Sequence, residues 1–266
     1  MDAGDLRVDG RPATPDDLAR IALVNYGAYT SFRVEAGGVR GLDLHLARLE
    51  TSATELFGEP AGEDRLRRLM RDAVAGRPDC WLRVSLFAPE IGPRTPDWRG
   101  APRVLTAVFP PPSPLFASVR LQTQVYAREA AALKHAATFG LIRARRLARA
   151  AGFDDALFVD GAGRVSEGSL WNIGFLQGDR VVWPAAPMLA GVGQALLRRG
   201  LSAVGLEEET REVRLADLTA FDGAFICNSA TPVCPVGLVD GHALAVQPAL
   251  IDRLHAAWAS NPPQPI

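Results

Sequence analysis

The chain has 266 residues, 48% of them hydrophobic and 22% charged, which is typical of a soluble globular protein with one large domain or two modest ones. Its formal net charge of −1 gives no reason to expect nucleic acid as a partner, and no apolar run is long enough to cross a membrane. Three cysteines without a paired spacing predict neither a disulfide framework nor a metal site, and the first ten residues lack the features of a secretory signal. We therefore expect a cytoplasmic protein.

The first part of the chain predicts strands and helices in turn. Apolar, aromatic and β-branched residues over 20–35 predict a strand with a turn at Gly27, and Gly37-Gly38 predicts a hairpin turn. Apolar residues at helical spacing predict a helix over 42–57 that ends at Gly58. The remaining expected elements are a helix at about 63–75 and strands at 80–88 and 103–109.

A proline run, PPPSP at 110–114, predicts an extended connector, because consecutive prolines fit neither a sheet nor a helix. We expect an N-terminal domain over 1–109, a linker over 110–118 and a C-terminal domain over 119–266. In the last of these the pattern predicts strands at 119–126, 155–160, 170–176, 180–184 and 224–239, the last with a turn, helices at 139–151, 193–204 and 247–258, and a frayed tail. Two mixed α/β domains are the predicted fold class.

One lysine, Lys134, stands against 28 arginines. Codon bias with one leftover lysine explains this count about as well as function does. The functional interpretation is that a lysine amine loses its proton and attacks a carbonyl, whereas a guanidinium stays protonated. Small apolar neighbours, Ala131, Ala132, Ala136 and Ala137, favour a desolvated amine. Schiff-base chemistry is therefore one explanation for a lysine at this position.

Three further segments carry groups suited to a charged ligand, and each also has an ordinary structural explanation. Glu167 lies between two predicted strands, where most glutamates are exposed turn residues. Gly191-x-Gly193 begins a predicted helix, and the free backbone amides at a helix start suit an anion. The same Gly-x-Gly pattern also begins the turn of a dinucleotide-binding site. The segment 228–231, Asn-Ser-Ala-Thr, offers hydroxyls and amides for a phosphate or carboxylate, or forms a plain hairpin turn.

Taken in order, these segments resemble the class IV aminotransferase family, the fold type IV enzymes that depend on pyridoxal 5'-phosphate (PLP). The matching stretches are HLARL at 45–49, LKH at 133–135, the block at 152–175, LAGVGQALL at 189–197 and the segment at 225–241. The resemblance implies a two-domain, D-amino-acid-aminotransferase-like fold. It also implies a homodimer with its sites close to the subunit interface.

The resemblance also assigns roles to single residues. It makes Lys134 the residue that holds PLP as a Schiff base and then acts as the acid and base. The cofactor-binding residues that it implies are Glu167 for the pyridine nitrogen and Arg48, Val192, Gly193 and Ser229 for the phosphate. The expected substrate-binding residues are Tyr29, Ser31, Arg33, Ala230 and Thr231, with Arg33 or Arg83 as a carboxylate binder.

Several positions depart from the pattern of the family. Gly193-Gln194 replaces a common threonine and arginine, and Phe139 replaces a tyrosine of some branches. Thr30-Ser31-Phe32 replaces the Glu-Gly pair of the branched-chain enzymes, and Phe87-Ala88 replaces an Arg-Gly pair of several lyases and D-amino-acid enzymes. These changes weaken assignment to any one branch.

The predicted function is amino transfer between a small amino acid or amine and a 2-keto acid. The missing Glu-Gly pair gives a slight preference for a D-amino acid or an (R)-amine. An aminodeoxychorismate-lyase-type enzyme that eliminates pyruvate is the alternative. A PLP-binding protein without turnover and a nicotinamide enzyme are further alternatives, against which Lys134 and Glu167 argue.

Overall fold

The computed structural model describes residues 5–113 and 117–266 and divides into two compact units. The first unit contains Met1–Pro112, Leu133–Ala137 and Pro263–Ile266, and the second contains Ser113–Ala132 and Thr138–Pro262. The first change of unit therefore falls within the predicted linker, of which residues 114–116 lie outside the described residues. The predicted C-terminal domain differs from the second unit because two of its segments, Leu133–Ala137 and Pro263–Ile266, belong to the first.

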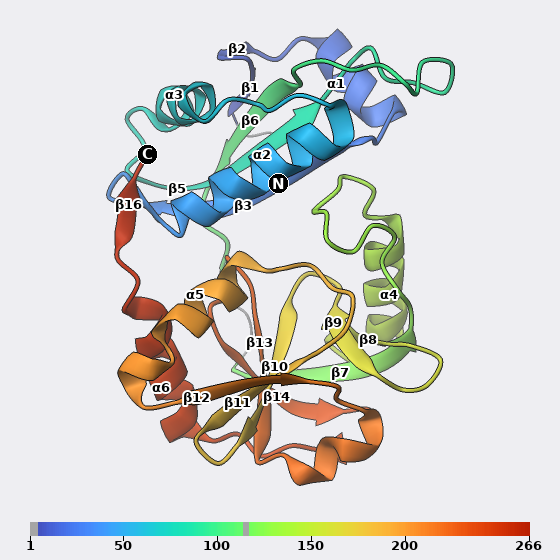
Figure 1. Ribbon diagram of the computed structural model, residues 1–266, viewed down its shortest axis with the longest axis vertical. Coiled ribbons are helices and arrows are strands. Elements are labelled where there is room, and N and C mark those ends of the chain that lie inside the picture. The colour runs from blue at the N-terminus through green and yellow to red at the C-terminus, as the bar shows by residue number, and fades with distance from the viewer. Residues whose placement is uncertain (1–4, 114–116) are drawn as a thin grey trace. The chain divides into compact units, whose positions relative to one another are not determined.

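The first unit is built on a seven-stranded sheet with the order β16-β4-β3-β5-β6-β1-β2 (Figure 1). Each described strand pair in it is antiparallel. The strands are β1 (Asp5–Val8), β2 (Arg11–Pro12), β3 (Gly27–Glu35), β4 (Gly38–Arg40), β5 (Asp79–Phe87), β6 (Arg103–Phe109) and β16 (Pro263–Pro265). The last strand comes from the tail that was expected to fray, so that expectation was wrong.

Three helices accompany this sheet, namely α1 (Pro15–Leu23), α2 (Leu42–Phe57) and α3 (Glu63–Val74). Helix α2 ends at Gly58, whose φ of 83° is the left-handed conformation that stops a helix. Helix α1 corrects the strand that was predicted to begin at residue 20. Thr14 and Asp17 form a capping box, and Pro15 occupies the first turn. These helix-start residues outweigh the strand-like composition of residues 20–23.

The two faces of the first sheet differ in chemistry because side chains alternate along a strand. Phe32 and Val34 of β3 and Leu82 and Val84 of β5 belong to the hydrophobic core that also contains residues of α2 and α3. The intervening residues point to the other face, where the register pairs Ser31 with Arg83 and Tyr29 with Ser85. The second face is therefore polar and aromatic, and it carries the residues of interest.

The second unit contains a nine-stranded sheet whose central part closes on itself. The order is β12-β11-β10-β13-β14-β7-β8-β9, with β15 on β14, and β9 pairs with β10 as well as with β8. The strands are β7 (Val119–Val125), β8 (Asp155–Val159), β9 (Val165–Gly168), β10 (Asn172–Gln177), β11 (Arg180–Pro184), β12 (Glu207–Arg211), β13 (Gly223–Cys227), β14 (Cys234–Val239) and β15 (His242–Ala243). Closure gives β9 a partner on both sides, although the sequence predicted only a turn there.

Helices of the second unit are α4 (Phe139–Ala150), α5 (Val192–Gly200) and α6 (Pro248–Ala259), with short 3-10 helices at Ser202–Val204 and Leu215–Ala220. Helices α5 and α6 pack closely, since a Cβ on Gly200 would lie 1.9 Å from the carbonyl oxygen of Ala257. In the described part of the chain, no helix has both the length and the apolar character of a membrane span.

Candidate active site

Lys134 lies on a short segment that adds to the free edge of β3. The amide of Tyr29 donates to the carbonyl oxygen of Lys134 at 2.9 Å, and the amide of Ala136 donates to that of Gly27 at 2.8 Å. This edge is available because β4 pairs with β3 only between Glu35 and Gly38. The lysine backbone is thus fixed by sheet hydrogen bonds.

The surroundings of the lysine side chain differ from the prediction. Ala132 and Ala137 are exposed, so the neighbouring alanines do not enclose the amine. The ring of Tyr29 does approach it, with its centroid 4.8 Å from Nζ. The amine of Lys134 therefore lies on an aromatic face, which attracts its protonated form.

The guanidinium group of Arg83 also lies over the ring of Tyr29. Its Cζ lies 3.6 Å from the centroid of the Tyr29 ring, and its Nε donates to Ser85 Oγ at 3.2 Å. Burial lowers the pKa of Arg83, and Tyr29 opposes this effect, but a guanidinium remains protonated. Arg83 has no carboxylate partner among the described residues. Two cationic side chains on one tyrosine ring form a site for an anion, such as the carboxylate of an amino acid.

Ser31 faces the same side of the sheet, directly across from Arg83, whereas Arg33 does not behave as a site residue. Arg33 is exposed and pairs bidentately with Asp79 at 3.0 Å, with Glu35 at 3.5 Å as a further partner. Its guanidinium is already neutralised at the surface. Arg33 is thus engaged in a surface ion pair, and Arg83 is the better placed of the two candidates for binding a carboxylate.

Arg48 projects from α2 and influences a buried histidine of the same helix. His45 is 1% exposed, and its Nδ1 lies 2.6 Å from Thr30 Oγ1. Burial holds the pKa of His45 well below 6.5, and the charges of Arg48 and Lys134 lower it further. The histidine is therefore neutral and packed, and the positive charge in this part of the first unit comes from Arg48 and Lys134.

In the second unit, Glu167 is a buried strand residue, 4% exposed. Its Oε1 accepts a hydrogen bond from the amide of Leu189 at 3.2 Å and lies 3.5 Å from Nη1 of Arg128. Arg128 also donates to the carbonyl oxygen of Ala131 at 3.3 Å. A buried carboxylate with a cationic partner is favoured in its ionised form. Arg128 was not predicted from the sequence, because the pair joins residues 39 positions apart.

The amino end of α5 is an open anion site. No side chain caps the helix, and in the described residues the amides of Val192, Gly193 and Gln194 have no acceptor. Glycine at positions 191 and 193 lets neighbouring residues lie close to the helix end. A Cβ on Gly191 would lie 1.9 Å from Asn172 Oδ1, and one on Gly193 would lie 2.8 Å from the carbonyl group of Asn228. Free amides and the helix dipole together favour a bound phosphate.

Gln194 adds an orphaned donor at this end of the helix. The residue is 5% exposed, and its Nε2 is buried without a hydrogen-bond partner in the described part of the chain. An unsatisfied buried amide costs free energy, which a ligand oxygen would recover. The close approach of Asn228 also explains why glycine, rather than threonine, stands at position 193.

The turn at 228–231 has fewer free donors than the sequence suggested. Asn228 Oδ1 accepts hydrogen bonds from the amides of Ala230 and Thr231, both at 2.8 Å. These amides are therefore already satisfied, which corrects their prediction as anion donors. The hydroxyl of Ser229, one residue from the Asn228 carbonyl that contacts Gly193, remains suited to a phosphate.

The cysteines play no part in this chemistry. All three are buried and none forms a disulfide in the described part of the chain, and burial raises the pKa of Cys227 strongly and that of Cys234 to about 11. Thiols in this state are protonated and unreactive. Among the described residues, His, Cys, Asp and Glu form no cluster suited to a metal ion.

Comparison with known proteins agrees with the lysine found in the first unit and with the carboxylate and helix-end anion site found in the second. The model of the amino-transferase class IV family matches residues 27–239. The chain belongs to this family. The match covers every residue that was predicted to take part in the site, from Tyr29 to Thr231.

Relatives of this class IV aminotransferase are distant in sequence. A probable branched-chain-amino-acid aminotransferase of Rickettsia felis is 28% identical over 109 residues, which cover 40% of this chain and 38% of the relative. The alignment therefore spans well under half of that protein.

Solved structures match over nearly the whole chain. A hypothetical aminotransferase from Mycobacterium tuberculosis in its PLP-bound form is 23% identical, with 97% of this chain and 99% of that chain covered and a TM-score of 0.79. The T.th. branched-chain amino acid aminotransferase with pyridoxamine 5'-phosphate is 20% identical, with 97% and 93% covered and a TM-score of 0.84. The Escherichia coli branched-chain enzyme is 18% identical, with 95% and 92% covered and a TM-score of 0.82. The predicted two-domain fold is confirmed.

Proposed function

We propose that this class IV aminotransferase uses PLP to move an amino group between an amino acid or amine and a 2-keto acid. The observation that carries this proposal is the position of Lys134, the one lysine of the chain, on the polar face of the first sheet beside Tyr29 and Arg83. A lysine amine forms a Schiff base with a carbonyl group, which none of the 28 arginines can do.

The residues present fit this cofactor. The uncapped end of α5, the cradle that a Cβ on Gly191 or Gly193 would fill, and the orphaned Nε2 of Gln194 all suit a phosphate. In the second unit, Ser229 adds a hydroxyl; in the first unit, Arg48 is the cation that the family resemblance assigns to the phosphate. Glu167, ionised beside Arg128, would hold the proton of the pyridine nitrogen, and Lys134 would bind the aldehyde carbon.

The cofactor, when bound, supplies a ring that withdraws electrons from the reacting carbon. The chain supplies the proton transfers and the orientation. Nζ of Lys134, as an unprotonated amine, would take the proton from the substrate Cα and hold it for its return. Arg83 binds and orients the substrate carboxylate, while Arg128 keeps Glu167 charged so that the proton stays on the ring nitrogen.

Substrates of this site carry a carboxylate, because Arg83 is a cation without a carboxylate partner in the described residues. Ser31 lies beside it, whereas Thr30 and Phe32 point into the core, so the position between them is polar and small. We retain the preference for a D-amino acid or (R)-amine donor, which rests on the missing Glu-Gly pair at residues 30–32. With an (R)-amine donor, the carboxylate that Arg83 binds is that of the 2-keto acid. The pyruvate-eliminating lyase is the alternative, and it differs in needing no keto-acid acceptor.

We further infer a homodimer in the cytoplasm. Large apolar side chains outside the described cavity linings are exposed on the second unit, among them Val125 at 76% and Phe139 at 78%. Exposed apolar side chains of this size favour a subunit interface. Sedimentation equilibrium of the purified protein tests this inference.

The first experiment is the visible absorption spectrum of the purified protein, before and after addition of D-alanine. We expect a band of bound cofactor that shifts with the amine and disappears in Lys134→Ala. A protein that stays colourless after incubation with PLP would contradict the proposal.

A panel of D- and L-donors with pyruvate or 2-oxoglutarate then defines the substrate. Strong activity on L-leucine or L-valine alone would overturn the preference for the D- or (R)-series. Pyruvate release without any acceptor would favour the lyase.

A further inference from the structure

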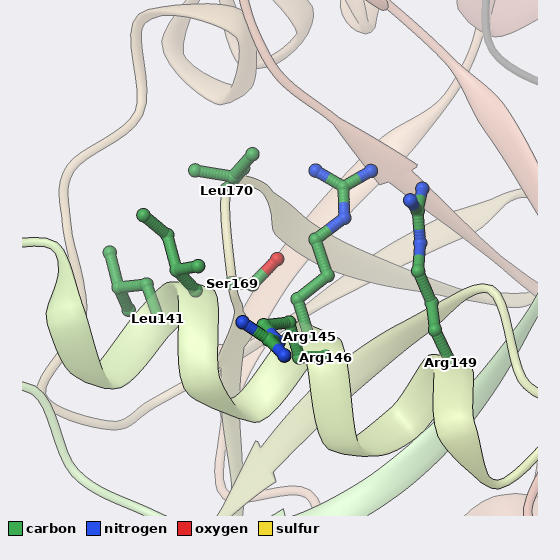
Figure 2. Close-up of a pocket in the computed structure, with 7 residues that line it drawn as sticks. Leu141, Arg145, Arg146, Arg149, Ser169 and Leu170 are labelled. Atoms are coloured by element: carbon green, nitrogen blue, oxygen red, sulfur yellow. The ribbon is translucent and has the colours of Figure 1, made fainter.

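A cavity of about 350 Å³, lined by both arginine and apolar side chains, lies in the second unit along α4. Three arginines of the helix line it, Arg145, Arg146 and Arg149, together with Ser169 and apolar side chains that include Leu170. Figure 2 shows Arg149 extending from α4 to the side on which Ser169 and Leu170 lie. Residues three and four positions apart share one face of a helix, so the arginines are brought together by their spacing.

The charges in this cavity are largely uncompensated. Arg145 Nε lies 3.4 Å from Asp155 Oδ2, but Arg146 and Arg149 have no carboxylate partner in the described part of the chain. Arg149 donates to a carbonyl oxygen, that of Asp154, at 3.3 Å. Arginines of other regions, such as Arg103 and Arg164, do pair with carboxylates. Arg146 and Arg149 therefore lack the neutralising carboxylate that Arg103 and Arg164 have.

Repulsion between its arginines destabilises helix α4. Its sequence, FGLIRARRLARA, contains four arginines and no acidic residue. Arg145 and Arg149 stand four positions apart, where like charges repel. A bound anion would remove this repulsion, which gives the cluster a physical reason to bind one.

Ser169, which lines the cavity, is held in place by a buried carboxylate behind it. Asp155, 5% exposed, accepts hydrogen bonds from Ser169 Oγ at 2.6 Å and from Trp171 Nε1 at 3.1 Å. These bonds occupy the carboxylate and hold the loop that follows Glu167. Little reorganisation is therefore needed when a ligand enters, which favours affinity.

The apolar side chains of the lining indicate that the ligand has an apolar part besides its anionic group. Leu141, Ile142 and Leu170 contribute hydrocarbon surface beside the guanidinium groups, and Ile142 and Leu170 are 55% and 41% exposed. A ligand that joins an apolar body to an anionic group would cover both kinds of surface.

We propose that the cavity along α4 binds a small phosphate monoester with an apolar body. Arg146 and Arg149 hold the dianionic phosphate, since guanidinium forks match its oxygens, and Leu141, Ile142 and Leu170 contact the body. This site takes no part in the amino transfer proposed above.

Phenyl phosphate is a suitable probe, titrated by calorimetry into protein that has been loaded with PLP, fixed with borohydride and freed from excess cofactor. Fixation fills the phosphate site at α5, so that the probe reports on α4. We expect saturable binding that is roughly tenfold tighter than that of inorganic phosphate, because the apolar body is buried as well. Phenol, which lacks the dianion, should not bind.

The Arg146→Gln/Arg149→Gln variant should weaken phenyl phosphate binding at least about tenfold, through the loss of charge-assisted hydrogen bonds. Arg143→Gln is the matched control, because Arg143 is exposed on the same helix and does not line the cavity. Binding that is absent, non-saturable or equally weakened by Arg143→Gln would overturn the proposal. If the protein does not take up PLP, the proposed function fails, while the comparison of these variants still decides this site.

Discussion

In the first unit Lys134 is held through its backbone, whereas in the second unit Glu167 is held through its strand, β9, and also through its carboxylate. The lysine carbonyl and the neighbouring amide of Ala136 make sheet hydrogen bonds, and the amine lies on the Tyr29 ring. The glutamate is buried, and its carboxylate meets the Leu189 amide and Arg128.

This difference corresponds to the tasks proposed for the two residues. A side chain that forms and breaks bonds with a substrate needs a fixed backbone and an amine that is able to move, and backbone hydrogen bonds allow both. A group that holds a single proton needs a fixed end, which a buried ion pair provides. The variants that follow test each part of this comparison, starting with the largest expected effect.

Lys134→Arg keeps a positive charge on the Tyr29 ring and removes the amine. We expect amino transfer to fall roughly a thousandfold or more, because a guanidinium does not act as the nucleophile. Steady-state rates with excess PLP measure the loss, and the far-UV circular dichroism should be unchanged. Activity close to that of the parent would mean that this position needs only a cation.

Arg128→Met breaks the buried pair with Glu167 and should lower the free energy of unfolding by about 3 kcal/mol, since a charge is left buried alone. Urea unfolding followed by tryptophan fluorescence measures the change. The double variant Arg128→Met/Glu167→Gln should recover part of the loss, because no unpaired charge remains.

Arg33→Gln is the control for this experiment, because its pair with Asp79 is exposed. We expect no measurable change in stability from it. If Arg33→Gln and Arg128→Met lowered the free energy of unfolding equally, burial of the Arg128–Glu167 pair would make no difference to its contribution.

Gly193→Ala places a methyl group 2.8 Å from the Asn228 carbonyl and should push the α5 end away from its turn. Overpacking of this kind costs about 1.4 kcal/mol, which corresponds to a dissociation constant for PLP raised about tenfold. Equilibrium titration of the apoenzyme measures it. Gly161→Ala has open space around the new Cβ and should leave the constant unchanged; the same value for all three proteins would contradict the assignment of α5.

His45 gives the smallest expected effect, and it depends on pH. Its pKa is lower in the folded chain than its ordinary value of 6.5, so the unfolded state takes up a proton first as the pH falls. The stability contributed by the neutral form is therefore present above pH 6.5 and lost below it, by about 1 kcal/mol between pH 7 and pH 5.5. His45→Asn should lack this component, so its stability deficit should shrink on acidification; a deficit independent of pH would refute the assignment.

Elements with strong local signals were predictable from the sequence. Helix α2 was predicted over 42–57 and found there, since its apolar spacing and Gly58 agree. Strand β9 was missed because four residues ending in glycine carry no periodicity, and β16 because two of its three residues are prolines. The partner of β16, β4, also comes from a distant part of the chain, and one sequence does not reveal such a pairing.

The same distinction applies to the candidate site. Lys134 was found from composition and Gly193 from its place before a helix. Arg128 and the choice of Arg83 over Arg33 required the structure, because they depend on which side chains are buried together. Local chemistry was visible in the sequence, while the partners of each charged group were not.

The strand β16 also affects the order in which the protein is able to fold during synthesis. Pro263–Pro265 pairs with β4 at the edge of a sheet whose other strands lie within the first 109 residues. The ribosome makes those strands long before it makes their last partner. The first unit must therefore wait, with one edge unpaired, while the whole second unit is translated, and a ribosome that stalls late leaves an open strand edge available to other nascent chains.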